Sequence, residues 1–490
     1  MVKATLRGAV LLGLLAWSVP SFAEVQNVKV GGDVTVRAFD RRNLDLNNGN
    51  GTLDHEDRFL MSTTGLNIGA DLTENVSTFV RLTNERDWNQ DGASTGDFDL
   101  SQAYITLKEL FYSPLTLRVG AQPIVWGRGF VLGSNLLPSV LRSPTGGGDR
   151  NAAITANEYT DFTAFDAIRA TLDLSGVAGI GVPLTADYVY VKLDENTIGV
   201  NDDVNLQGVN LGTHFDAWNS EAEAYYLNKR DKSQNGLNFN NPGSVSTFGL
   251  RGSIHPVEGA HLWGEAAIQF GQSAVSLSDG SRTPTSTGQA VSLTVPGSSA
   301  QALAMNFGGE YTFTDVQTTP KIGGEWVFYS GHDKDGAFQG WDPMAPSYFT
   351  TLIRSFQTRS TVTGLYPVTQ TGVSAGFTNQ HEFAIFGGLK PIQDLNVSTR
   401  LSWFTLDVGA IPPTVNGSSA KRETFLGTEW DTKVVYDYTD DVQFGFAYGL
   451  FAPGAVFRDG GDNGTGAAAC TACFGDDTAQ ELISTVSVKF

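Results

Sequence analysis

The chain is poor in the residues that mark several common classes of protein. Its 490 residues include two cysteines and six scattered histidines, too few for a disulfide-rich scaffold or a histidine-based metal centre. No segment reaches the roughly 18 consecutive apolar residues that a transmembrane helix needs. Basic residues number 32 against 52 acidic ones, and the net charge of −20 excludes the basic face that nucleic-acid binding requires.

Residues 1–23 have the three-part pattern of a secretory signal peptide. Two basic residues precede an apolar run over 9–19, and Ser21 and Ala23 are small residues at the positions that a signal peptidase reads. We expect cleavage after Ala23, which leaves residues 24–490 as the mature protein.

The two cysteines, Cys470 and Cys473, lie three residues apart near the C-terminus. Export to an oxidising compartment favours a local disulfide between them. A redox-active pair would need a helix start that lowers a thiol pKa, and a zinc site would need further ligands nearby.

The mature chain has a repeated period-2 rhythm, in which runs of roughly 10 to 15 residues alternate apolar with polar or small side chains. Short connections alternate with long ones, as periplasmic turns and extracellular loops do in outer-membrane barrels. The pattern predicts an all-β fold, an 18-stranded antiparallel transmembrane β-barrel in a bacterial outer membrane. We expect its strands near residues 28–40, 57–73, 76–88, 98–110, 115–122, 160–173, 183–193, 205–216, 219–232, 245–256, 258–271, 300–313, 320–332, 380–390, 393–408, 423–437, 441–452 and 480–490.

The expected strands have two different faces. In 76–88, Val80 and Leu82 alternate with Arg81 and Thr83, so one face suits lipid and the other a wet lumen. The last strand ends on an aromatic residue, Phe490, which is typical of the signal read by the barrel assembly machinery. We therefore expect this machinery, outer-membrane lipids and lipopolysaccharide as partners.

Four arginines on predicted lumen faces lie three to six positions from the short-turn ends of their strands, and we expect them to form a belt. A guanidinium ring favours passage of anions, whereas cross-strand pairing of the belt with Glu310 and Glu325 would neutralise it. Both alternatives stay open. The four are Arg81, Arg118, Arg169 and Arg251, and Arg400 is a further lumen candidate.

The long connection 123–159 is unusually apolar for a solvated outer loop, with Trp126, Phe130 and Leu136 among its residues. We predict that it folds into the barrel and narrows the pore. The alternative is a loop packed on its neighbours at the rim, and connection 333–379 raises the same question.

Residues 45–56 partly match a calcium-binding loop, with oxygen ligands at Asp45 and Asn47 and a glutamate, Glu56, at the twelfth place. The sixth place holds Asn50 instead of glycine, so we expect an ordinary turn-rich loop and no cofactor. No nucleophile-elbow motif and no paired metal-binding histidines occur, so we do not expect an enzyme.

Two segments resemble the alginate export family of outer-membrane porins. Residues 117–122 followed by 126–129 are similar to the family's R-x-G-x-Q strand and glycine-rich inward loop, and residues 426–431 with 451–454 are similar to its late strand pair. The resemblance implies an 18-stranded barrel with a narrow charged pore, partly plugged by loops, that in the family's exporters carries an acidic polysaccharide. It also implies pore or constriction roles for Arg118, Arg128, Glu429 and Asp431.

The predicted lumen is mixed in charge and the mature chain is acidic, and neither property helps a polyanion pass. We therefore predict a porin for passive diffusion or export of small hydrophilic or anionic solutes, which include saccharides. The alternative is a non-conducting barrel that acts as scaffold, sheath or adhesin for a periplasmic or extracellular protein partner. The predicted pore-lining set is Arg81, Arg118, Arg128, Arg169, Arg251, Arg400, Glu310, Glu325, Glu429 and Asp431.

Overall fold

The structure is a computed structural model, and it describes most of the chain. The described residues are 26–44, 46, 56–88, 98–112, 114–134, 155–176, 182–194, 203–232, 243–272, 299–331, 340–355, 377–410, 423–458 and 477–490. The predicted signal peptide, Cys470 and Cys473, and Asp45 and Asn47 of the calcium-loop candidate lie outside these residues.

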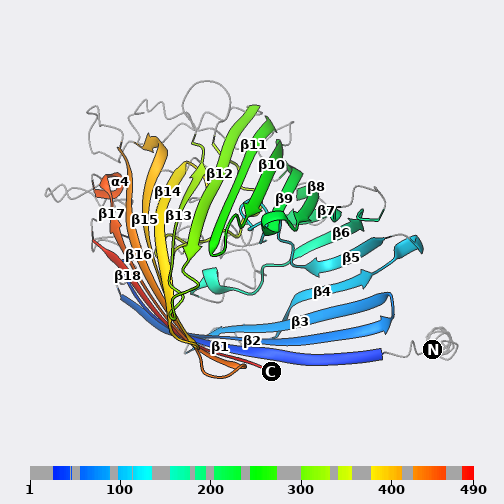
Figure 1. Ribbon diagram of the computed structural model, residues 1–490, viewed down its shortest axis with the longest axis horizontal. Helices are drawn as coiled ribbons and strands as arrows, with labels where there is room; N and C mark the ends of the chain where they lie inside the picture. The colour runs from blue at the N-terminus through cyan, green and yellow to red at the C-terminus, as the bar shows by residue number, and fades with distance from the viewer. Residues whose placement is uncertain are drawn as a thin grey trace, which may run out of the picture.

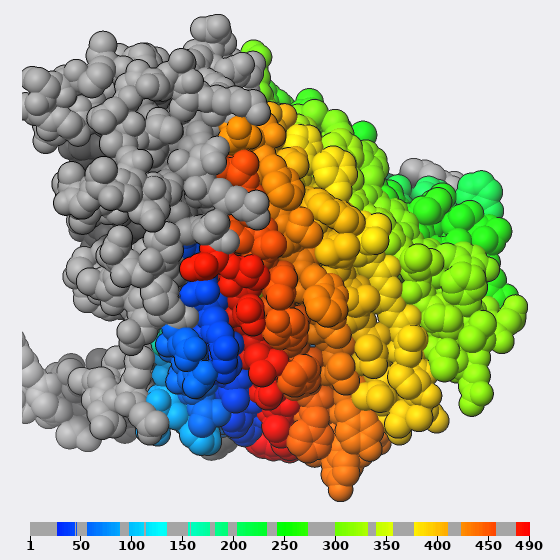
Figure 2. Space-filling view, turned by 90° about the vertical axis from the view of Figure 1, so that its left-hand side faces the viewer, coloured from blue at the N-terminus to red at the C-terminus, as the bar shows by residue number. Residues whose placement is uncertain are grey.

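Eighteen antiparallel strands form one sheet that closes on itself, because β1 pairs with both β2 and β18 (Figure 1). Figure 2 shows the first and last strands side by side on the outer surface. The predicted fold class is confirmed. The strands are β1 (Gln26–Arg42), β2 (Glu56–Thr73), β3 (Val76–Asp87), β4 (Asp99–Leu107), β5 (Leu115–Gln122), β6 (Phe165–Asp173), β7 (Leu184–Asp194), β8 (Val204–Phe215), β9 (Ser220–Asp231), β10 (Gly243–Ile254), β11 (Ala260–Gln272), β12 (Ser299–Thr312), β13 (Lys321–Tyr329), β14 (Gln380–Ile392), β15 (Leu395–Ala410), β16 (Glu423–Asp437), β17 (Val442–Pro453) and β18 (Ala479–Lys489).

Helical structure among the described residues is limited to short pieces. These are three 3₁₀ turns, η1 (Leu110–Tyr112), η3 (Asn157–Tyr159) and η4 (Ala217–Asn219), one α-helical turn, α4 (Ala455–Arg458), and the helical residues 353–355. Within the described part of the chain, no helix is both long and apolar enough to cross a membrane.

The period-2 pattern sorts side chains between the two sides of the wall. Val119 on β5 and Ile168 on β6 are 42% and 43% exposed, whereas Gln122 and Ala167, which have the opposite parity on the same strands, are buried. Because a barrel has no sheet edge and its outer face meets lipid, large exposed apolar side chains on alternate positions are stable there.

The interior is filled in part by two segments that connect strands. The first inner segment, residues 123–134, follows β5, and the second inner segment, residues 340–355, lies between β13 and β14. They pair with each other through a parallel bridge between Leu132 and Ala345. Both contribute to one buried apolar cluster with inward side chains of β6–β13.

Aromatic contacts fix the course of the first inner segment across the lumen. Trp126 lies 6.2 Å from Tyr225 of β9, measured between ring centroids, and Phe130 stacks at 5.1 Å on Tyr329 of β13. Residues 123–134 therefore lie inside the barrel, against strands distant from β5. The prediction covered 123–159, of which 135–154 lie outside the described residues.

Candidate functional site

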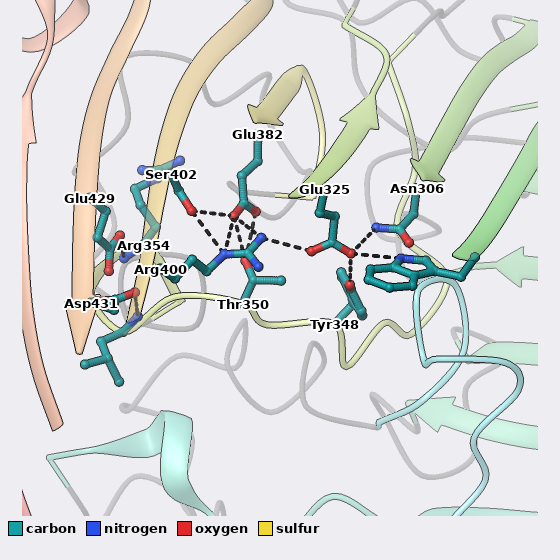
Figure 3. Close-up of polar contacts among 12 residues, drawn as sticks. Asn306, Glu325, Tyr348, Thr350, Arg354, Glu382, Arg400, Ser402, Glu429 and Asp431 are labelled. Carbon is teal, nitrogen blue, oxygen red and sulfur yellow. Dashed lines mark hydrogen bonds and ion pairs between the residues drawn. The ribbon is translucent and has the colours of Figure 1, made fainter. Parts of the chain in front are cut away.

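The site is the charged inner wall together with the two inner segments. On β13–β15, Arg400 lies between two carboxylates, as Figure 3 shows. Its Nη2 is 2.9 Å from Glu325 Oε2 and 2.7 Å from Glu382 Oε1. The two carboxylate side chains are only 2% and 6% exposed, so they require a paired cation.

The second inner segment attaches to the same carboxylates. Tyr348 donates its hydroxyl hydrogen to Glu325, and Thr350 donates to Glu382 at 2.8 Å (Figure 3). Burial raises the pKa of Tyr348 above its usual range, so the phenol stays protonated and remains a donor. Asn306 of β12 also donates to Glu325, at 2.9 Å.

Two further carboxylates, both on β16, bind the backbone of the second inner segment. Glu429 accepts from the backbone N–H of Ile353 at 2.6 Å and of Arg354 at 2.9 Å. Asp431 accepts from the N–H of Leu352 at 3.3 Å. These donors begin a helical turn, where backbone N–H groups lack intrahelical partners and favour an anion.

A glycine on the neighbouring strand makes this attachment possible. A Cβ at Gly449 of β17 would stand 2.8 Å from Asp431 Oδ1 and 3.2 Å from the Cβ of Leu352. A larger residue at 449 would therefore displace the second inner segment from the wall.

Wall carboxylates also bind the end of the connection that begins with the first inner segment. Glu85 accepts from Thr160 Oγ1 at 2.8 Å and from the N–H of Asp161 at 2.5 Å. Asp87 accepts from the N–H of Thr155 at 2.6 Å. The segment 155–161 is thus tied to the inner face of β3.

The first inner segment is bound at a tight turn. Gly127 has φ +56° and donates its N–H to Glu223 Oε2 at 3.1 Å. Its Cβ position would lie 2.7 Å from Cδ of Arg251, so only glycine fits without displacing that side chain. Arg251 in turn pairs with Glu223 at 2.5 Å.

The sequence pattern of the alginate export family matches residues 26–470. The chain belongs to the alginate export family. No curated protein sequence matches it. Its fold is similar to that of OccAB1 from Acinetobacter baumannii, with a TM-score of 0.52 and 9% identity over 96% of this chain and 99% of that one. A BenF-like porin from Pseudomonas fluorescens Pf-5 gives a TM-score of 0.49 and 11% identity over 95% and 99%.

Family membership and the closed barrel together make this chain a porin-like protein of the bacterial outer membrane. The alginate export family is one of channels rather than enzymes. The likeness to the solved structures concerns the fold alone, because identity is low.

In this alginate export family barrel, three of the four belt arginines form ion pairs. Arg81 binds Asp33 at 2.7 Å, Arg169 binds Asp187 at 2.6 Å, and Arg251 binds Glu223 as described. These three arginines are therefore paired with carboxylates and do not form a belt of free guanidinium groups.

Glu310 and Glu325, the acids expected to neutralise the belt, pair with other basic residues instead. Glu310 lies 3.2 Å from Lys321, and Glu325 binds Arg400. A side chain on a barrel wall reaches only one or two strands away, so acids of β12 and β13 cannot reach β3 or β6. The acids that do pair with the belt, Asp33, Asp187 and Glu223, escaped the sequence analysis, although each has inward parity on its strand.

Three other arginines of the barrel stack on aromatic rings. The guanidinium carbon of Arg37 is 4.9 Å from the ring centroid of Tyr159, and that of Arg118 is 4.6 Å from Tyr104. Arg128 of the first inner segment lies 4.2 Å from Trp263 and also approaches Tyr348.

Within the described residues, none of these three arginines has an ion pair with a carboxylate. Nη1 of Arg37 and Nη1 of Arg128 are buried and have no hydrogen-bond partner there. Arg118 is the register partner of Arg169, so one paired and one ring-stacked guanidinium lie on adjacent strands. Roles for the predicted set in lining a conducting pore stay a prediction.

Among the three proposed ligands of the calcium-loop candidate, the structure describes Glu56. It lies in β2, and its Oε2 is 3.1 Å from Nη2 of Arg58. Among the described residues no group of three or more potential metal ligands occurs.

Proposed function

We propose that the barrel is a passive, narrow channel for small anionic solutes, among them acidic saccharides. The observation that carries the proposal is the set of ring-stacked guanidiniums, Arg37, Arg118 and Arg128. Arg118 uses its Nε to donate to Thr106 Oγ1 at 3.2 Å, which leaves its terminal N–H groups for a solute, and a guanidinium fork matches a carboxylate.

Charges without an ion pair support a transverse field across the path. Arg118 lies on β5, whereas Glu429 and Asp431 lie on β16, on another part of the wall, and none of the three has an ion pair among the described residues. A solute that carries both a carboxylate and hydroxyl groups would orient in such a field.

The inner segments favour small solutes over a polymer. Phe130 of the first and Trp341 of the second are each 1% exposed, so the segments are packed into the lumen as a core. Packing of this density removes much of the cross-section that an 18-stranded barrel would otherwise leave open.

Uptake into liposomes that contain the refolded mature protein tests the proposal. We expect galacturonate to enter severalfold faster than galactose, which differs in lacking the carboxylate, and a long polyuronate to be excluded. Replacing Arg118 and Arg128 together by alanine should abolish the difference. The control Arg230→Ala removes the same charge from the outward side of β9 and should preserve it.

The dense packing of the inner segments also favours a second function, a non-conducting barrel that serves as scaffold, sheath or adhesin for a partner protein. In that case neither sugar would enter faster than it enters empty liposomes. Equal entry of both sugars through wild-type protein would instead remove the anion preference and keep the channel.

A further inference from the structure

The outer face of the barrel changes from apolar to charged side chains where β1 and β2 approach their extracellular ends. Ala38 of β1 pairs with Leu60 of β2, and both belong to the apolar outer face. Two positions further, Asp40 pairs with Arg58, and both are charged. Outward parity follows from Phe39, which is 4% exposed and packs inside the barrel.

The height of this step matches the boundary of the membrane. The outward side of β2 is free of charged residues from Leu60 to Ala70, ten residues apart. At about 3.3 Å per residue and a strand tilt near 40°, this stretch is roughly 25 Å tall, which is the height of the apolar band of an outer-membrane barrel. Its lower end meets the short turn after Thr73, so the charged row lies at the outer-leaflet headgroups.

One carboxylate organises two guanidiniums in the charged row. Nε of Arg42 is 3.2 Å from Asp40 Oδ1, and Nε of Arg58 is 3.0 Å from Asp40 Oδ2. Glu56 holds Nη2 of Arg58 at 3.1 Å. In the part of the chain that the structure describes, the terminal nitrogens of Arg42 have no partner, and the two arginine side chains are 44% and 57% exposed.

Amphipathic side chains flank the arginines. Trp88, which is 44% exposed, donates its indole N–H to Ser62 of β2 at 3.2 Å. Beyond β1 on the other side, Tyr448 of β17 donates to Gln480 of β18 at 3.4 Å. Such side chains favour the level of lipid headgroups, where one end is apolar and the other is wet.

We propose that Arg42 and Arg58 bind a phosphate group of a phosphorylated glycolipid in the outer leaflet. Guanidiniums held by their Nε atoms present their terminal N–H groups to a phosphate in a fixed geometry. The apolar face directly below the row, at Ala38 and Leu60, receives the acyl chains of the same molecule. A phosphate without acyl chains would use only half of this surface.

Native mass spectrometry of the full mature barrel in mild detergent tests the site. The probes are diphosphoryl lipid A, phosphatidylglycerol and inorganic phosphate. We expect lipid A to bind, and the Arg42→Gln/Arg58→Gln variant to bind it about tenfold more weakly or worse, since two charge-assisted contacts are lost. The matched control Arg230→Gln, outward on β9, should bind as wild type does.

A glutamine variant that fails to show heat-modifiable migration would be replaced by Arg42→Lys/Arg58→Lys. This variant keeps both charges and loses the guanidinium fork, and it should bind lipid A more weakly than wild type. Unchanged lipid A binding in a folded double variant overturns the proposal. So does equal binding of phosphatidylglycerol, which would indicate a general anionic headgroup contact, and so does phosphate alone binding as well as lipid A.

Discussion

Removing Glu429 should release the second inner segment from the barrel wall. Its carboxylate accepts two backbone hydrogen bonds, from Ile353 at 2.6 Å and from Arg354 at 2.9 Å. Hydrogen bonds to a charged group contribute about 1.5–3 kcal/mol each, so Glu429→Ala removes about 3–6 kcal/mol of attachment. The variant also removes a buried charge and its desolvation cost, which places the net effect near the lower value.

A loss of about 3 kcal/mol changes the ratio of detached to attached segment by roughly a hundredfold. Single-channel recording in a planar bilayer should show this as new or longer-lived high-conductance states. The control Glu310→Ala deletes the same charge from the inner wall, on β12, where the carboxylate binds Lys321 and touches neither inner segment. Folded Glu429→Ala protein with wild-type conductance and wild-type gating would refute the attachment.

Three further substitutions test other parts of the account. Arg400→Gln leaves two buried carboxylates without their cation, so the free energy of unfolding in denaturant titrations should fall by about 3 kcal/mol; an unchanged midpoint would contradict this. Arg118→Ala should move the reversal potential in a salt gradient toward cation preference, whereas Arg169→Ala should move it less, because Asp187 already pairs with Arg169; equal shifts would argue against the distinction. Gly449→Val overfills the wall against the second inner segment and should cost about 1–3 kcal/mol of stability, and a neutral effect would show that the segment yields there.

The fold could be predicted because the barrel imposes a period of two on every strand. The parity of Arg118 against Val119 correctly separates lumen from lipid face, and the same holds for Gly449 against Leu450. Alternation of short and long connections then fixes the strand directions, which leaves little freedom in an 18-stranded closed sheet.

The partners within the site could not be predicted, because they depend on the stagger between strands and on where the inner segments cross the lumen. Arg81 reaches Asp33 across β2 rather than an acid of β12, and no local pattern encodes that offset. Tyr348 and Thr350 approach Glu325 and Glu382 only because the connection folds inward. A long connection rich in aromatic residues signals that inward course, but it does not give the contacts.

The most direct test of the central claim, a narrow but open channel past the inner segments, is single-channel conductance of the refolded wild-type protein in a planar bilayer. We predict small, discrete and reproducible steps with a preference for anions. Silence from protein that is heat-modifiable and β-rich would contradict the claim, because it would mean that the inner segments close the lumen and that the barrel serves a partner instead of a solute.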